Sequence, residues 1–307
     1  MNFVHKIEKF SLLGLGRHAD RFIIPALNNS KYSSLELVGR RQKQNYQDAV
    51  NSSGIDSVYI CLPNSMHAEW TIRALEAGKN VICEKPLAYN KADTEQIISA
   101  QKSSGKKLLE AFMYRHHPQH HIVRKLLSEN KIGTPRLFEA HFHYFLDDYS
   151  NIRFSSELDG GGLLDVGCYL TDACLFLFEG VVKKINGSWI LNEKANIDEF
   201  ASAQIEFASG LVANLTCGNR LNRQSSYTIF GDRGKITVRD AFRIPKNKKG
   251  QILLETVEGE KLEIFSEAAD HYQLMIEHFC TEHTEELSLL RQRAELIELW
   301  REVCVRS

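Results

Sequence analysis

The sequence predicts an N-terminal α/β domain with a doubly wound parallel sheet and a C-terminal α+β domain with a mostly antiparallel sheet. Three observations predict this fold class. The chain has 307 residues, which is more than one hydrophobic core usually accommodates. Short apolar runs alternate with helical patterns up to about Phe112, as in β-α-β units. After Pro118, strand patterns follow one another with turns between them. We therefore expect domains at residues 1–117 and 118–307.

The N-terminal domain should contain five strands joined by crossover helices. Residues His67–Ala77 have apolar side chains at helical spacing, and Gly78 follows as a C-terminal cap. Asn90 is a suitable N-cap for the next helix, which Gly105 ends. The expected strands are Phe10–Leu13, Leu35–Val38, Ser57–Leu62, Asn80–Cys83 and Lys107–Phe112.

The C-terminal domain shows two-residue alternation. Apolar and polar residues alternate along Phe138–Tyr144 and along Ala201–Phe207, so one face of each strand should be buried. Turns are expected at Ser209-Gly210 and at Gly231–Gly234. Helices are expected around Tyr272–Cys280 and Glu285–Val305.

Composition excludes several classes of function. The net charge is −1, which gives no electrostatic reason to expect a nucleic acid partner. No apolar run approaches the roughly 20 residues of a membrane helix, so we expect no membrane partner. The 7 cysteines form no C-x-x-C pair and mostly have apolar neighbours, as reduced core thiols do. A cytoplasmic location fits this pattern.

The segment Gly14-Leu15-Gly16-Arg17-His18-Ala19 follows a predicted strand and opens a predicted helix. The first glycine permits a tight turn, and the second lets the backbone approach a pyrophosphate at the helix N-terminus. This setting favours a dinucleotide over an ordinary glycine turn.

The second strand ends in Gly39-Arg40-Arg41, where NAD-specific proteins place a carboxylate on the ribose hydroxyls. A guanidinium would instead pair with a 2′-phosphate. The sequence therefore favours NADP(H) over NAD(H), the alternative being a solvated basic loop.

Glu84-Lys85-Pro86 follows a strand at the edge of the sheet where doubly wound folds bind ligands. An ammonium there could polarise a substrate oxygen, although a lone lysine at a strand end is more often a surface residue. Farther along, three glycines precede Asp165 and Tyr169, which share one face if the stretch is helical. The alternative is a capped helix with a core tyrosine.

Four separated motifs together resemble the glucose-fructose oxidoreductase, inositol dehydrogenase and rhizopine-catabolism (Gfo/Idh/MocA) family. They are Val58–Asn64 with His67, Ala74–Val81, Glu84–Pro86 and Gly160–Asp172. The resemblance implies a Rossmann domain followed by a domain whose large open antiparallel sheet commonly forms subunit contacts. We accordingly expect a homodimer or higher homo-oligomer through the C-terminal sheet.

Many members have histidine at the position of Tyr169. Tyrosine there resembles the branch that contains glucose-fructose oxidoreductase, dimeric dihydrodiol dehydrogenase, xylose dehydrogenases and nucleotide-sugar 3-ketoreductases. By resemblance, Lys85 and Tyr169 form the catalytic polar pair, Asp165 orients the substrate or the pair, and Arg115 stands beside cofactor or substrate. These four residues form the expected substrate site. The expected cofactor site comprises Gly14, Gly16, Arg17, His18, Arg40, Arg41, Leu62, Pro63, Asn64, His67, Glu84, Lys85, Pro86 and Arg115.

The chain departs from the family in one place. Members usually have a further helix and strand after the second strand, whereas only Gln42–Asn45 separate it here from the segment matching Tyr46–Val50. The loop over the adenine side of the cofactor site must therefore differ in structure from that of other members.

The histidines His116, His117, His120 and His121 include i, i+4 pairs. Pro118 interrupts them and no further ligand has suitable spacing, so we expect no metal. Three functions remain open: a reductase or dehydrogenase of a sugar or sugar-derived substrate, a dihydrodiol-type dehydrogenase, and a catalytically silent NADP-binding sensor or assembly subunit.

Overall fold

The computed structural model describes residues 6–39, 43–178, 180–281 and 286–305. The chain divides into two compact units. The first unit comprises residues 1–113 and 270–294, and the second comprises residues 114–269 and 295–307. The expected domains were 1–117 and 118–307, whereas the first unit ends its first segment at residue 113 and also includes residues 270–294.

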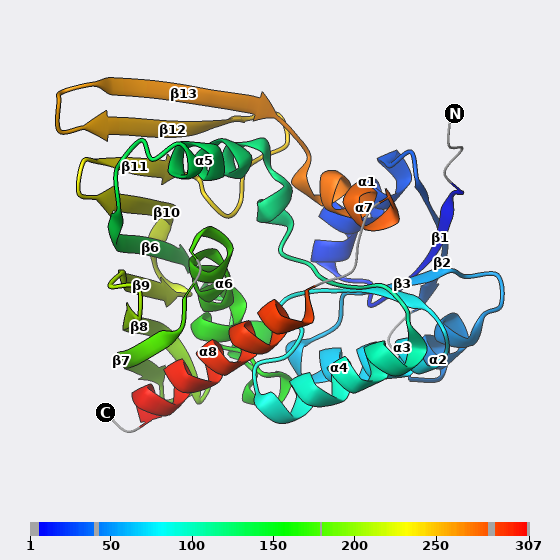
Figure 1. Ribbon diagram of the computed structural model, residues 1–307. Coiled ribbons are helices and arrows are strands. Elements are labelled where there is room, and N and C mark those ends of the chain that lie inside the picture. The colour runs from blue at the N-terminus through cyan, green and yellow to red at the C-terminus, as the bar shows by residue number, and fades with distance from the viewer. Residues whose placement is uncertain (1–5, 40–42, 179, 282–285, 306–307) are drawn as a thin grey trace. The chain divides into compact units, whose positions relative to one another are not determined.

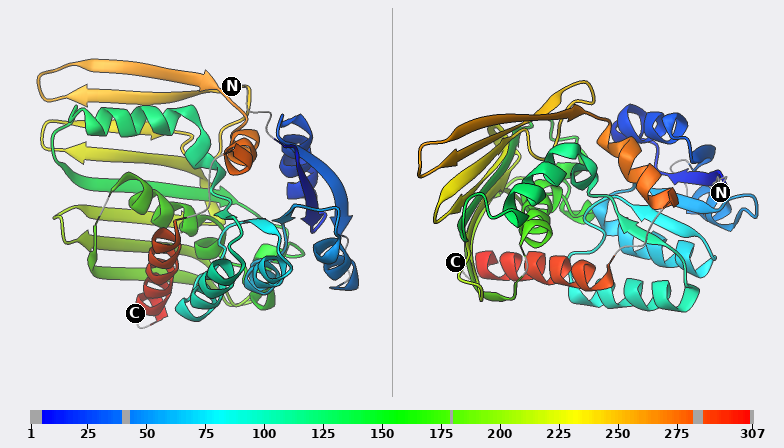
Figure 2. Two further views of the ribbon diagram at one scale, coloured as in Figure 1. Left: turned by 45° about the vertical axis from the view of Figure 1, so that its right-hand side comes forward. Right: turned by 45° about the horizontal axis from the view of Figure 1, so that its top comes forward.

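The first unit contains a parallel five-stranded sheet in the order β2-β1-β3-β4-β5 (Figure 1). Helices α1 and α7 lie on one face, and α2, α3 and α4 lie on the other (Figure 2). The doubly wound prediction is thus confirmed. The strands are β1 (Glu8–Leu13), β2 (Ser33–Gly39), β3 (Ser57–Ile60), β4 (Asn80–Cys83) and β5 (Leu108–Glu110). The helices are α1 (Ile24–Asn29), α2 (Lys43–Asn51), α3 (His67–Glu76), α4 (Lys91–Ser104) and α7 (His271–Thr281).

Local signals fixed the crossover helices as expected. The Asn90 side chain accepts a hydrogen bond from the Asp93 amide at 2.8 Å and caps α4. Gly105 ends α4 at a φ of 64°, in the left-handed region that favours glycine. The shortened connection is also present, because α2 alone joins β2 to β3 and β2 is an edge strand of the sheet.

Residues 270–294 belong to the first unit because they supply part of its core. The ring of Phe279 on α7 lies 6.1 Å from that of Phe10 on β1. Leu290, in helix α8 (Leu287–Val305), is fully buried in the same core as α2, α3 and α4. Arg293 pairs with Glu110 at 2.7 Å, and both side chains are buried. The sequence carries no signal that tells whether the apolar residues of 270–294 pack in the first unit or on the C-terminal sheet.

The second unit is built on an eight-stranded sheet in the order β13-β12-β11-β10-β6-β9-β8-β7. All its neighbouring strands are antiparallel except β6 and β9, which confirms the mostly antiparallel prediction. Its strands are β6 (Pro135–Phe145), β7 (Val182–Asn192), β8 (Ile197–Phe207), β9 (Val212–Gly218), β10 (Arg220–Gly231), β11 (Gly234–Arg239), β12 (Lys249–Thr256) and β13 (Lys261–Ala268).

Helices cover one face of this sheet. They are α5 (Pro118–Ser128), α6 (Cys168–Leu177) and the last turns of α8 (Figure 2). Phe138, Ala140 and Phe142 are buried beneath them, as the alternation predicted. The opposite face presents side chains such as Glu139, His141 and Ser202, and no described helix of this unit covers it.

One helical stretch of the described chain, Ser156–Leu177, is long and apolar enough to cross a membrane by length and composition alone. The sequence analysis had recognised no run of this length. In the structure, 78% of its most apolar window is buried.

Candidate active site

The two glycines of the turn after β1 differ in whether a side chain would fit at their positions. Gly14 has a φ of 94°, and a Cβ there would lie 2.3 Å from the carbonyl oxygen of Cys61. For Gly16, by contrast, no described residue apart from its chain neighbours lies within 4 Å of the place a Cβ would take. The helix that follows begins at Arg17 and includes a π-helical turn, η1 (Ala19–Ile23), for which His18 makes no side-chain capping hydrogen bond. The first N–H groups of a helix have no acceptor within it, and beside a bare Cα they suit the pyrophosphate of a dinucleotide.

A buried carboxylate lies behind this turn. Glu84 accepts hydrogen bonds from the Tyr59 hydroxyl at 2.9 Å and from His18 at 3.3 Å. Burial alone would raise the pKa of Glu84, but His18, Lys85 and Tyr59 together lower the pKa below its ordinary value. The ring of Tyr272 lies 5.6 Å from that of His18. Glu84 therefore orients His18, the second residue after Gly16.

Lys85 and Pro86 form the turn after β4, and the peptide bond between them is cis. His67 supports this turn from α3. Its Nδ1 lies 2.7 Å from the carbonyl oxygen of Pro86, and its Nε2 lies 2.8 Å from that of Leu62. The His67 side chain is buried, and burial lowers its pKa. Both ring nitrogens thus face backbone carbonyls, so His67 positions the turn. Its contact with the cofactor stays a prediction.

The remaining predicted cofactor residues of the first unit lie at the ends of its strands. Arg17 is exposed in the first turn of the helix after the glycines. Leu62 is buried, while Pro63 and Asn64 are half-buried at the start of a short 3₁₀ turn, Asn64–Met66. Arg40 and Arg41 lie outside the described residues.

In the second unit, the predicted acid and phenol are on one helix. A π-helical turn, η6 (Leu163–Gly167), carries Asp165 and continues into α6, which carries Tyr169 near its start. Both side chains are buried, at 9% and 5% exposure. The conditional prediction that this stretch is helical is confirmed. π-Helical turns often occur at functional sites.

Two residues that sequence reasoning missed hold Asp165. The Tyr144 hydroxyl on β6 donates to Asp165 Oδ2, and Arg153 Nε donates to the same oxygen at 2.7 Å. Asp165 raises the pKa of Arg153, and burial followed by Asp165 raises the pKa of Tyr144. A carboxylate held by a cation and a phenol is suited to orienting a hydroxyl group. The alternation placed Tyr144 on the buried face, which was the only signal for either residue.

Arg115 is held by α6. Its guanidinium forms two hydrogen bonds to Asp172, one of them from Nε at 2.8 Å, and the Tyr114 hydroxyl donates to Asp172 at 2.6 Å. Asp172 is fully buried. Arg115 also lies over the Phe176 ring at 5.2 Å. These contacts anchor Arg115 to α6. The expected contact of Arg115 with cofactor or substrate stays a prediction.

The Tyr169 ring lies among aromatic neighbours. Its centroid is 5.3 Å from that of Phe142, and 5.9 Å from those of Tyr114 and Phe242. Such edge contacts fix the ring plane. The predicted catalytic residues thus fall into two groups, with Lys85 in the first unit and Asp165 and Tyr169 in the second.

The histidine cluster has structural contacts. His117 caps α5 by accepting from the Gln119 amide at 3.3 Å. His120 contacts the Tyr227 hydroxyl at 2.9 Å and the Ala241 carbonyl at 2.8 Å. Within the described ranges, no three His, Cys, Asp or Glu side chains are grouped to hold a metal ion.

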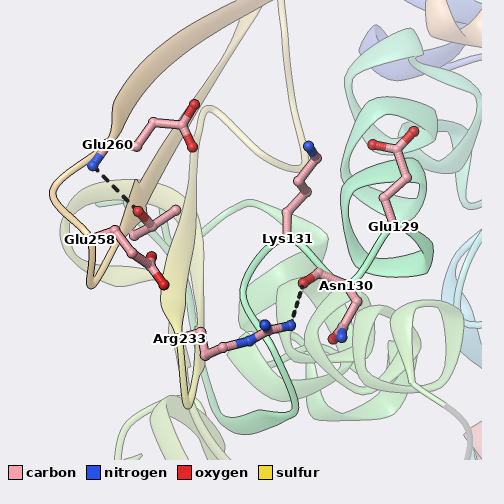
Figure 3. A pocket seen from close by; sticks show the side chains of 7 residues that line it. Glu129, Asn130, Lys131, Arg233, Glu258 and Glu260 are labelled. Atoms are coloured by element: carbon pink, nitrogen blue, oxygen red, sulfur yellow. Dashed lines mark hydrogen bonds between the residues drawn. The ribbon is translucent and has the colours of Figure 1, made fainter.

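A surface hollow of about 470 Å³ lies at the hairpin ends of the second unit. Its walls mix charges of both signs, and Arg233 donates to the Asn130 carbonyl at 3.3 Å (Figure 3). The lining residues are Glu129, Asn130, Lys131, Arg233, Thr256, Glu258 and Glu260. None of them is a predicted site residue.

Comparison with known proteins identifies the family. Residues 9–112 match the oxidoreductase family with an NAD-binding Rossmann fold, and residues 120–237 match the GFO/IDH/MocA C-terminal domain. The chain belongs to the Gfo/Idh/MocA oxidoreductase family. The expected family is thereby confirmed.

Several members are similar over most of the chain. A dTDP-3,4-didehydro-2,6-dideoxy-alpha-D-glucose 3-reductase of Saccharopolyspora spinosa is 31% identical over 82% of this chain and 80% of its own. The D-xylose 1-dehydrogenase (NADP(+)) 2 of Haloferax volcanii is 26% identical over 88% of this chain and 87% of its own. A structure of a 3-ketoreductase from Actinomadura kijaniata with NADP and TDP-benzene has a TM-score of 0.89 and 26% identity, covering 97% of this chain and 98% of that one.

Proposed function

We propose that this protein is an NADP(H)-dependent oxidoreductase that interconverts a carbonyl and an alcohol on a sugar or sugar-derived substrate. The relatives support both parts of the proposal. The names of two specify a nucleotide-sugar or sugar substrate, and two of the three specify NADP. When bound, the nicotinamide supplies or accepts the hydride.

The chain's own residues handle the proton and the substrate. Tyr169 transfers the proton at the substrate oxygen, and Lys85 favours the phenolate form of a tyrosine, which is otherwise a weak acid with a pKa of about 10. Asp165 orients a substrate hydroxyl. The roles of Lys85 and Tyr169 rest on the family resemblance.

One observation carries the sugar assignment. Asp165, on the same helix as Tyr169, forms a polar group with Tyr144 and Arg153. Several convergent hydrogen-bonding groups are what a polyhydroxylated substrate requires, whereas an apolar diol needs apolar walls.

A substrate screen tests the proposal. Nucleotide-linked keto sugars, aldoses and dihydrodiols are offered with NADPH or NADP⁺, and absorbance of the reduced nicotinamide is followed. On the best substrate, Tyr169→Phe and Lys85→Ala should each lower turnover by about 10²–10⁴-fold and combine less than additively. Tyr169→Phe should leave NADPH binding nearly intact. Near-normal turnover of Tyr169→Phe would show that another group handles the proton.

A dihydrodiol-type dehydrogenase is the second candidate. The rings of Phe142, Tyr114 and Phe242 around Tyr169 favour it, because they offer apolar surface. Turnover of an aromatic dihydrodiol above that of every sugar would select this candidate. Absence of turnover on all substrates, with NADPH bound, would instead support the silent sensor or assembly subunit.

The preference for NADP(H) over NAD(H) has its own test. Arg40 and Arg41 follow β2, where a carboxylate would repel a 2′-phosphate. Calorimetric titration should give tighter binding of NADPH than of NADH, and Arg40→Ala should reduce the difference. Equal affinities would show that the rebuilt connection moves these arginines away from the cofactor.

We also propose that the protein is cytoplasmic and has no membrane or nucleic acid partner. It forms a homodimer through the sheet face that no described helix of the second unit covers. Ile190 on β7 is 56% exposed on that face and pairs with Phe200. The 7 free cysteines suit a reducing compartment. Light scattering at micromolar concentrations tests the assembly, and a monomer would contradict it.

A further inference from the structure

The run of glycines before the catalytic helix brings its backbone against a buried carboxylate. Gly161 has a φ of 110°, and a Cβ there would lie 2.2 Å from Asp198 Oδ1. A Cβ on Gly162 would lie 3.3 Å from Asp198 Oδ2 and 2.9 Å from the Cα of Gly218. A Cβ on Gly160 would lie 2.5 Å from the Arg153 carbonyl oxygen. Side chains at these positions would push the helix away from the carboxylate.

Asp198 acts as the cap that the helix itself lacks. The N-cap residue Gly162 has no side chain to cap η6. Instead, the Leu163 amide donates to Asp198 Oδ2 at 2.6 Å, and the backbone of Gly162 also hydrogen-bonds to this carboxyl group. Carboxylates at helix N-termini satisfy the free N–H groups and interact favourably with the helix dipole.

The cap is anchored in the sheet. Asp198 is the second residue of β8, and its side chain is 8% exposed. Ionisable groups on two neighbouring elements face it: Arg301 and Cys304 on α8, and Cys217 on β9. A strand of the sheet thus fixes the point at which the helix that carries Asp165 and Tyr169 begins.

We propose that Asp198 is a positioning residue for the proton-transfer step, because its carboxyl group fixes the start of the helix that presents Asp165 and Tyr169. The proposal rests on the proposed function. A tyrosine displaced by about 1 Å can lose up to about 10²-fold in rate. Asp198 itself does not transfer a proton, since both its oxygens face the backbone of the glycine run.

Asp198→Ala and Asp198→Asn test this role. The alanine variant should lower kcat by about 10–100-fold with little change in the KM for NADPH. Asparagine keeps one acceptor oxygen for the Leu163 amide, so Asp198→Asn should recover part of the lost kcat. Glu206→Gln is the matched control, because it removes a partly exposed carboxylate from the same strand, and it should leave kcat unchanged.

Hydrogen exchange provides a readout that needs no turnover. In both Asp198 variants, amides of residues 163–169 should exchange faster, while those of the first unit stay protected and NADPH binds as before. Wild-type kcat together with unchanged exchange in Asp198→Asn would overturn the inference, even if Asp198→Ala fails to fold. An inactive wild-type protein whose variants show the faster exchange would contradict only the proposed function.

Discussion

Two glycine-rich turns in this protein lead into helices that both contain a π-helical turn, but a carboxylate of the chain lies at the N-terminus of the second. After Gly14 and Gly16, the π-helical turn has no side-chain cap, and apart from its chain neighbours no described residue lies within 4 Å of the Cβ position of Gly16. After Gly160–Gly162, the helix N-terminus is filled by Asp198. The first turn is therefore suited to an external anion, and the second is already neutralised by the chain itself.

The comparison shows how a glycine that leaves space for a ligand differs from a glycine that is required by the packing of the protein. Gly161 is required by atoms of the protein, whereas Gly16 meets none. The sequence alone shows two similar motifs. Substitution of each glycine by alanine should separate the two cases, since one loses stability and the other loses cofactor affinity.

Gly161→Ala should have the largest effect. Its φ of 110° is strained for any residue with a Cβ, and the added carbon would overlap Asp198 Oδ1. We expect a loss of about 3 kcal/mol or more in the free energy of unfolding, with reduced turnover. Denaturant titration measures the loss.

Gly210→Ala is the control for Gly161→Ala. Gly210 also has a positive φ, of 87°, but no atom lies within 4 Å of its Cβ position. It should cost about 1 kcal/mol. Equal losses in the two variants would show that backbone strain, and not contact with Asp198, explains Gly161.

The sequence predicted elements where the signal is local. Asn90 and Gly105 mark the ends of α4 by their own chemistry, and alternation assigned Phe138 and Tyr144 to the buried face. The same logic placed Asp165 and Tyr169 on one helix.

Asp198 and Arg153 carried no such signal. Asp198 reaches Leu163 across 35 residues, and Tyr144 reaches Asp165 across 21. Sheet register and loop path create these contacts, and neither can be derived from a short window of sequence. His67 adds a contact of the same kind, since no sequence signal indicated that its ring nitrogens lie against the carbonyls of Pro86 and Leu62.

Gly16→Ala should have an intermediate effect, confined to the cofactor. A Cβ there meets no protein atom, so the free energy of unfolding should change by less than about 1 kcal/mol. It would occupy the space in which a pyrophosphate approaches the backbone, so the Kd for NADPH should rise by about 10-fold or more. Calorimetry measures the affinity.

Alanine substitutions at two further glycines serve as comparisons for Gly16→Ala. Gly54→Ala, which also meets no atom within 4 Å, should change neither stability nor affinity. Gly14→Ala should destabilise the first unit, because its Cβ would lie 2.3 Å from the Cys61 carbonyl oxygen. Unchanged NADPH affinity in Gly16→Ala would mean that the cofactor does not approach this turn.

The smallest expected effect concerns pH. Burial raises the pKa of Asp198 from 3.8 to about 7, although the backbone N–H groups and Arg301 oppose that rise. Between about pH 4 and pH 7 the folded state therefore binds more protons at this position than the unfolded state, so Asp198 makes the wild-type protein less stable as pH rises through that window.

Asp198→Asn should remove this dependence. Its stability relative to wild type should increase by about 1 kcal/mol between pH 6 and pH 7, rise by only about 0.3 kcal/mol more up to pH 8, and then remain constant. Glu84 provides the contrast in the first unit. Its pKa is lowered in the folded protein, so its contribution to stability is lost only as pH falls below about 4.5. Glu84→Gln should thus show no change in slope between pH 6 and pH 7. Denaturant titrations of the three proteins at both pH values measure these slopes. Parallel curves for wild type and Asp198→Asn would show that Asp198 is already ionised at pH 6, and that water or Arg301 compensates its charge more fully than its burial implies.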